Sequence, residues 1–508
     1  MRRFDSRRWF PAMMVLALAV TCTAAPAADF PYKLRFQVYE GPHDKTGQRW
    51  KSKTVELVPG SKEAQEWLEA HRASCPGLVK AYEELTASNR FTTYMRDLQT
   101  LEGARPTITL VDDSRKYVDA DKDGKPDTGE PARDEEGVWP HARGGNIFIS
   151  QSYFGTYTDV DSVHELLIHE FSHTQDHTGR GLGDYGPDDS HFGDEELYNH
   201  GHNLPFFWQG GHYSPRAAFL EGWANFTPLV FEPDGRDGMV SSIEEIRRET
   251  EKGKYTMKPW KEASFDELIS VEYVNSLILF DLYRFIPGAK DKIWAAFRET
   301  NHGGRTLVEL LARLVADHPE DAFAVAAIFD AYTRFQASDS TLDKLLGKDL
   351  AAVYRREHRG KAKEQNASGT VGDAEDVGRW AAANLRVPAA EASLALLDRR
   401  LAGLRGWHLS PLDIIGGPGA ILVRHYLQER ERARLEALRR QVAAELERLR
   451  AEQAARNAAV TRLQPALMLP PAAGVPVSVS PEEPATAPPP PAGRPAATFD
   501  GAPVPWGR

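Results

Sequence analysis

The stretch His164-Glu-Leu-Leu-Ile-His169-Glu170-Phe-Ser-His173 decides how the rest of the chain is interpreted. On a helix, residues four positions apart share a face, so His169 and His173 can offer both imidazoles to one metal ion. Glu170 projects from the same turn, where it can act as a general base toward water. We therefore predict a metal-binding helix from Val160 to His177. The alternative is an amphipathic helix that happens to carry two histidines.

Downstream of the histidine motif, the stretch Leu220-Glu221-Gly-Trp-Ala-Asn225-Phe226 lies on a second predicted helix. Catalytic zinc sites hold three protein ligands and leave one position open. Together with the histidine motif, this stretch resembles the gluzincin metallopeptidases, the clan that includes thermolysin and the aminopeptidase N group. The resemblance implies that His169, His173 and Glu221 hold zinc and that Glu170 is the general base.

The resemblance covers roughly residues 145–290 and departs from the clan in its details. His173 and Glu221 are 48 positions apart, which implies an insertion over or beside the cleft. Asn225 stands where thermolysin-like members carry an aspartate that supports a ligand histidine. Tyr273 opens a stretch similar to the aminopeptidase helix whose tyrosine stabilises the oxyanion. Asn275-Ser276 replaces the usual Lys-Gly there, so Tyr273 is interpreted either as catalytic or as a packing residue.

A calcium site is predicted in the acidic stretch Asp119-Ala-Asp121-Lys-Asp123-Gly124-Lys125-Pro-Asp127-Thr-Gly-Glu130. Acidic residues fall at loop positions 1, 3, 5, 9 and 12, and a glycine falls at position 6. This is the spacing of an EF-hand loop, in which position 7, here Lys125, contributes its backbone carbonyl. The flanking sequence is not clearly helical, which favours a short extracellular calcium loop. A solvated acidic turn is the alternative.

Composition and the N-terminal segment indicate an exported protein. The 508 residues are 41% hydrophobic and 27% charged, which is typical of a soluble chain with several domains. The net charge is −11 and no basic tract is present, so nucleic-acid binding is not expected. Residues 1–28 combine early arginines, a short apolar segment and an Ala-x-Ala site, and are predicted to be a signal peptide. No later stretch is long enough to span a membrane, so we expect a periplasmic or secreted protein.

The hydrophobic patterns predict an α+β fold. The predicted elements are a strand hairpin at 32–39 and 53–58, further strands at 107–111 and 146–150, and helices that include 61–88, 216–231, 271–285 and 307–316. We expect a zincin-like catalytic domain with a small mixed sheet over the metal helix, a helical lower half and a further helical C-terminal region. The expected parts are an N-terminal β/α region with the calcium loop (29–145), the catalytic core with a helical subdomain (146–358), a linker (359–376), a helical region (377–463) and a disordered Pro/Ala-rich tail (464–508). Within the core, Asn146–Ser150 is predicted to be an edge strand to which an extended peptide can pair.

Residues 424–463 are predicted to form one long, highly charged helix. Its apolar stripe consists of Leu435, Leu438, Val442, Leu446 and Leu449. A coiled-coil partner that binds through this helix is one interpretation. The spacing slips at Glu445, so a solvated helix packed on its own domain is the other.

From the residues and the resemblance we expect an exported zinc-dependent metallopeptidase that acts on a peptide or protein substrate, with Glu170 as general base. Two alternatives stay open. One is a binding or structural protein that keeps zinc without turnover. The other is a hydrolase of a non-peptide amide or ester.

Overall fold

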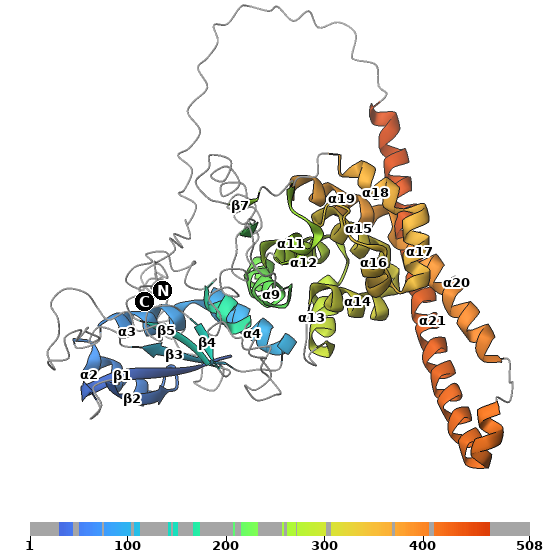
Figure 1. Cartoon of the computed structure of the whole chain (residues 1–508). Helices are drawn as coiled ribbons and strands as arrows, with labels where there is room; N and C mark the ends of the chain where they lie inside the picture. Colours follow the sequence, from blue (N-terminus) through green and yellow to red (C-terminus); the bar gives the residue numbers. More distant parts are fainter. Residues whose placement is uncertain are drawn as a thin grey trace, which may run out of the picture. The chain divides into compact units, whose positions relative to one another are not determined.

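The computed structural model describes two compact units, Met1–Gly183 and Asp184–Arg508, and each is presented by itself. The described residues are 30–43, 50–73, 76–102, 106–111, 141–143, 146–150, 166–172, 207–208, 215–231, 257–258, 262–270, 272–300, 306–367, 371–405 and 411–467. A small mixed sheet lies in the first unit, and helices dominate the second, so the fold is α+β at this level (Figure 1). The predicted signal peptide, the calcium loop at 119–130 and residues 468–508 lie outside the described residues.

The sheet of the first unit has five strands in the order β2-β1-β3-β5-β4. The strands are β1 (Lys33–His43), β2 (Trp50–Leu57), β3 (Thr107–Val111), β4 (His141–Arg143) and β5 (Asn146–Ser150). The first two strands form an antiparallel hairpin, as the alternating sequence predicts. The parallel pairs β1–β3 and β3–β5 confirm the strands that were predicted at 107–111 and 146–150.

The prediction that Asn146–Ser150 is an edge strand was wrong. β3 pairs with β5 along one side, and β4 pairs antiparallel with its first three residues on the other. The two strands are joined by Gly144-Gly145, a pair typical of tight hairpin turns. The edge of the sheet is therefore β4. The sequence does not predict this strand, because three residues are too few for an alternating pattern to be recognised.

Three helices accompany this sheet: α2 (Lys62–His71), α3 (Pro76–Ala87) and α4 (Asn89–Glu102). One helix was expected from Ser61 to Ser88, but a second begins at Pro76 because proline is tolerated in the first turn of a helix and not in its interior. Tyr32, which is fully buried, donates a hydrogen bond from its hydroxyl to the Leu85 carbonyl (3.0 Å). This contact fixes the start of β1 to α3.

The second unit is built almost entirely from helices. They are α9 (Pro215–Phe231), α11 (Phe265–Ile269), α12 (Glu272–Phe285), α13 (Ala289–Glu299), α14 (Leu307–Asp317), the short 3₁₀ helix η4 (Pro319–Asp321), α15 (Ala322–Tyr332), α16 (Asp339–Leu346), α17 (Lys348–Glu357), α18 (Arg359–Gln365), α19 (Val371–Asn384), α20 (Arg386–Arg405) and α21 (Pro411–Leu467); the strands β6 (Phe207–Trp208) and β7 (Met257–Lys258) form a two-stranded ribbon. Every residue of α15 is buried, because its sequence is apolar on all sides except at Asp330, and α12, α16, α18, α19 and α20 surround it. α15 is therefore the core of this unit.

The segment 359–376 differs from the expected linker, since it contains α18 and the first residues of α19. The Arg359 guanidinium binds both carboxylate oxygens of the fully buried Asp330, at 2.9 and 3.1 Å. The same guanidinium donates to the carbonyls of Phe335 (3.0 Å) and Ala337 (2.9 Å). A bidentate pair of this kind is strong and directional, so the segment belongs to the helical unit. The polar composition that suggested a linker reflects its solvated face.

The long charged helix packs on its own unit. Its stripe residues Leu435, Val442, Leu446 and Leu449 are buried in one cluster with Ala390, Leu397 and Leu401 of α20. Ion pairs Arg439–Asp398 and Arg450–Glu391 cross the two helices in opposite order along the chain, so α20 and α21 form an antiparallel hairpin (Figure 1). Of the two interpretations, the structure supports the helix packed on its own domain.

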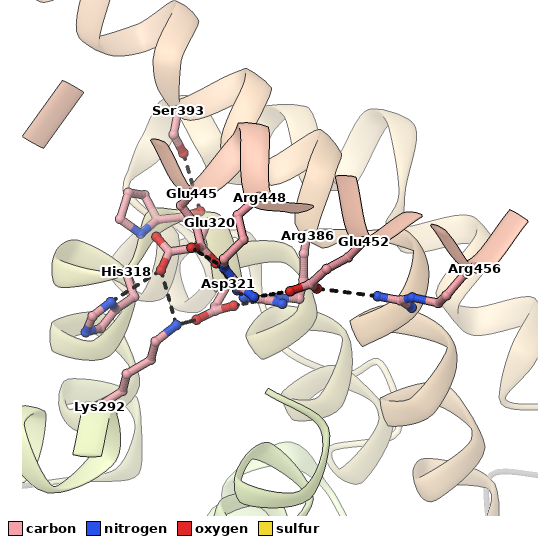
Figure 2. Close-up of polar contacts among 11 residues, drawn as sticks. Lys292, His318, Glu320, Asp321, Arg386, Ser393, Glu445, Arg448, Glu452 and Arg456 are labelled. Atoms are coloured by element: carbon pink, nitrogen blue, oxygen red, sulfur yellow. Dashed lines mark hydrogen bonds and ion pairs between the residues drawn. The ribbon is translucent and has the colours of Figure 1, made fainter. Parts of the chain in front are cut away.

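Glu445 interrupts the stripe because it lies over a network of buried charges, which Figure 2 shows. Arg386, at the start of α20, donates to Glu445 Oε1 at 3.2 Å and to Asp321 Oδ1 at 2.6 Å. The other oxygen of Asp321 accepts from Lys292 Nζ of α13 at 2.5 Å. Arg448 also binds Glu445, with its Nε 2.8 Å from Oε2. The network thus joins α13, η4, α20 and α21.

The neighbouring Glu320 is part of the same network. Its Oε1 lies 3.2 Å from Lys292 Nζ and 3.3 Å from His318 Nδ1, while its side chain is only 4% exposed. Burial alone raises the pKa of this carboxyl, but the hydrogen bond from His318 and the charge of Lys292 outweigh burial and bring the pKa to about 2. The ionised form of Glu320 is therefore part of the folded structure.

We expect Arg386→Met to lower the free energy of unfolding by about 3–5 kcal/mol, because it leaves a buried carboxylate without one of its two cations. Urea denaturation of the full chain measures the loss. Arg439→Met is the matched control. It also removes an α20–α21 ion pair, but the two side chains of that pair, Arg439 and Asp398, are 45% and 52% exposed. The control should lose less than about 1 kcal/mol. Equal losses in the two variants would show that the buried contacts of Arg386 stabilise the fold no more than the exposed Arg439–Asp398 pair does.

The pKa of Glu320 also predicts acid lability. Its carboxyl titrates near pH 2 in the folded chain, against an ordinary value of 4.5, so its contribution is present above pH 4.5 and is lost as the pH falls toward 2. A shift of this size corresponds to about 3 kcal/mol. Unfolding free energies measured across this pH range should therefore fall less steeply in Glu320→Gln than in the wild type. Parallel pH profiles would show that Glu320 has an ordinary pKa in the folded chain.

Candidate metal centre

The described part of the predicted metal helix is residues 166–172 in the first unit. Leu167, Ile168 and Phe171 are fully buried and form the side of the helix that packs into the core. The Ser172 hydroxyl donates back to the Ile168 carbonyl at 2.9 Å, which satisfies the hydroxyl within the helix. These three apolar residues therefore bury one side of the helix.

His169 and Glu170 differ in exposure although they are neighbours. The His169 side chain is partly exposed, whereas Glu170 is only 7% exposed. Consecutive helical residues point about 100° apart, so one helix turn presents the imidazole near the surface and holds the carboxylate deeper. His173, the second predicted imidazole ligand, lies outside the described residues.

Glu221, the predicted third ligand, lies on α9 in the second unit and is 1% exposed. It is the only acidic residue of this helix, and its apolar neighbours Leu220 and Trp223 are buried with it. A carboxylate buried among apolar groups requires a cation, a hydrogen-bond donor or a proton. Its environment is therefore that of a ligand or of a buried structural carboxylate, and it excludes the ordinary surface glutamate.

The backbone next to Glu221 is fixed by contacts to two helices. The hydroxyl of Ser276, on α12, donates to the Gly222 carbonyl at 2.8 Å, and Ser276 is fully buried. Trp223 stacks on Phe297 of α13 with ring centroids 3.8 Å apart and an angle of 8° between the ring planes. Packing on both sides therefore restrains the turn of α9 that carries the predicted ligand.

The two residues at which the sequence departs from the aminopeptidase pattern make structural contacts. Asn275 donates from Nδ2 to the Ile269 carbonyl at the end of α11 (3.1 Å), and Ser276 binds α9 as described above. Sequence reasoning missed these roles, although two polar residues before an apolar run are a signal of buried hydrogen bonds. Tyr273 lies in the first turn of α12, and its side chain is outside the described residues. Asn225 is partly exposed one turn after Glu221.

The predicted site residues are distributed over both units. His169 and Glu170 belong to the unit Met1–Gly183, and Glu221 and Tyr273 belong to the unit Asp184–Arg508. All six predicted calcium ligands lie outside the described residues: Asp119, Asp121, Asp123, Lys125, Asp127 and Glu130. Among the residues that the structure describes, no three or more His, Cys, Asp or Glu side chains lie close enough together to hold a metal ion. The zinc ligand set stays a prediction.

Comparisons of the chain with protein-family models, with curated proteins and with solved structures found no match. The candidate metal centre is therefore argued from the residues of this chain alone. No helix in the described part of the chain combines the length and the apolar character that a membrane span requires.

Proposed function

We propose that the chain is an exported zinc-dependent metallopeptidase, with zinc held by His169, His173 and Glu221. The observation that carries the proposal is the burial of Glu221, which is 1% exposed and follows a His-Glu-x-x-His motif in the sequence. Two imidazoles and one carboxylate are a ligand set that zinc accepts in catalytic sites, and such a set leaves a coordination position open. By donor type, these three side chains therefore suit zinc.

A zinc ion at this site would supply Lewis acidity toward the scissile carbonyl and increase the acidity of water. Glu170 would accept the proton of the attacking water and deliver it to the nitrogen of the leaving amine. Tyr273 would donate a hydrogen bond to the oxygen on which negative charge develops. Asn225 would orient a ligand histidine by hydrogen bonding to its second ring nitrogen.

The proposal is tested by separating the base from the ligand. Glu170→Gln should keep zinc and lose hydrolysis by roughly 10²–10⁴-fold, because the amide preserves shape but cannot accept the proton. Glu221→Ala should lose zinc as well as activity, since one of three protein ligands is missing. The measurements are zinc content and digestion of an unbiased peptide library, before and after chelation.

Glu267→Gln is the matched control, because Glu267 is also buried, at 4% exposed, and lies in the capping box of α11. Glutamine can fill that capping position, so this variant should keep both zinc and activity. Near wild-type turnover in Glu170→Gln would remove the proposed mechanism. Tight stoichiometric zinc in Glu221→Ala would mean that another residue is the third ligand. His191 and Glu195, in the stretch between the two predicted helices, are the next candidates. Hydrolysis of simple amides or esters without peptide cleavage would favour the non-peptide alternative.

We also propose that calcium binds the loop from Asp119 to Glu130, whose five carboxylates repel one another without a cation. An ion that binds only the native state stabilises it by mass action. Millimolar calcium should therefore raise the melting temperature by roughly 3–5 °C. The Asp121→Ala, Asp123→Ala double variant should show no such rise. Equal shifts in both proteins, or none in the wild type, would leave the loop as a solvated acidic turn.

A further inference from the structure

Four large hydrophobic side chains near the start of α21 are exposed. Leu422, Val423, Tyr426 and Leu427 are 68%, 61%, 67% and 54% exposed, and we call these four residues the apolar tip. Their spacing of one and four positions places them on one side of the helix. In the part of the chain that the structure describes, Val58, at 48%, is the one other exposed large hydrophobic residue. The exposure is therefore concentrated in one place.

α20 covers the apolar stripe of α21 but ends before it reaches the apolar tip. Arg432 Nη2 donates to the Leu404 carbonyl at 3.3 Å, one residue before α20 ends at Arg405. Leu427 precedes Arg432 by five residues, so the apolar tip lies beyond the end of α20, at that end of the α20–α21 hairpin. In the sequence, residues 414–423 contain no charged residue.

The charge of this end is opposite to that of the rest of the chain. Between Asp398 and Arg439, whose ion pair joins α20 to α21, residues 399–438 contain seven arginines and four acidic residues, a net charge of +3. Because the whole chain carries −11, the remaining residues carry −14. Arg399, Arg400 and Arg430 are exposed. The apolar tip thus belongs to a segment of net positive charge in an acidic chain.

We infer that the apolar tip docks on an anionic lipid surface. Apolar side chains on one side of a helix enter the headgroup region, and nearby arginines are attracted to the lipid phosphates. Tyrosine is favoured at this depth because its ring is apolar and its hydroxyl is polar. The positive charge selects this occupant over a second copy bound tip to tip, which would bring two basic surfaces together. The inference is independent of the proposed zinc site.

The test is sedimentation of the full chain with vesicles of phosphatidylcholine alone or mixed with phosphatidylglycerol. Binding should require the anionic lipid and weaken as salt is added. The Leu422→Ser, Leu427→Ser double variant should bind about tenfold or more weakly, since two leucines no longer enter the lipid. Arg399→Gln and Arg430→Gln should each weaken binding by roughly fivefold on anionic vesicles only. Val58→Ser, at an exposed residue of the first unit, is the control and should bind as the wild type does.

Because the substituted residues are exposed, circular dichroism should show an unchanged helix content in every variant. Equal binding to both kinds of vesicle, or wild-type binding by the double variant, would overturn the proposal. Light scattering adds a second decisive outcome. A dimer that the Leu422→Ser, Leu427→Ser substitutions dissociate, in a chain that does not bind vesicles, would make the apolar tip an interface between copies and overturn the lipid proposal.

Discussion

The helical unit depends on one carboxylate held between two cations. Asp321 is fully buried, and its two oxygens accept from Lys292 at 2.5 Å and from Arg386 at 2.6 Å. Burying either charge alone would cost several kcal/mol, so each makes the burial of the other possible. Glu445 completes the set from α21. Four elements, α13, η4, α20 and α21, thus meet at one cluster of charges.

Local patterns allowed much of the fold to be predicted. The parallel strands at 107–111 and 146–150 and the helices now called α9, α12 and α14 were recognised from period and composition alone. The edge of the sheet was not, because strand order depends on pairing between segments and β4 has only three residues. The contacts that hold the elements together were also out of reach: Ser276 and Gly222 are 54 residues apart, and Arg386 and Asp321 are 65 apart.

The candidate metal centre likewise has parts that local patterns predict and parts that they do not. His169, Glu170 and His173 were proposed from a spacing that one helix imposes, so no tertiary information was needed. Glu221 required a resemblance, and what the structure adds is its burial on α9 and the two neighbouring helices that restrain its turn. Polar residues that looked like departures from a functional pattern proved to be structural. A local pattern can propose candidate ligands, whereas the contacts that restrain the turn of Glu221 come from segments far away in the sequence.

The break in the apolar stripe at Glu445 has a consequence for the register of the helical hairpin. Two long helices with a seven-residue repeat can slide past each other by one repeat, and a single buried polar residue is a known means of preventing it. A slip of seven residues would place Glu452 opposite Arg386, so the ion pair by itself would tolerate the error. The same slip would bury Gln453 and Arg456 where leucines now pack. Charge and apolar residues thus agree in only one alignment of α21, and it is their coincidence that selects the native register.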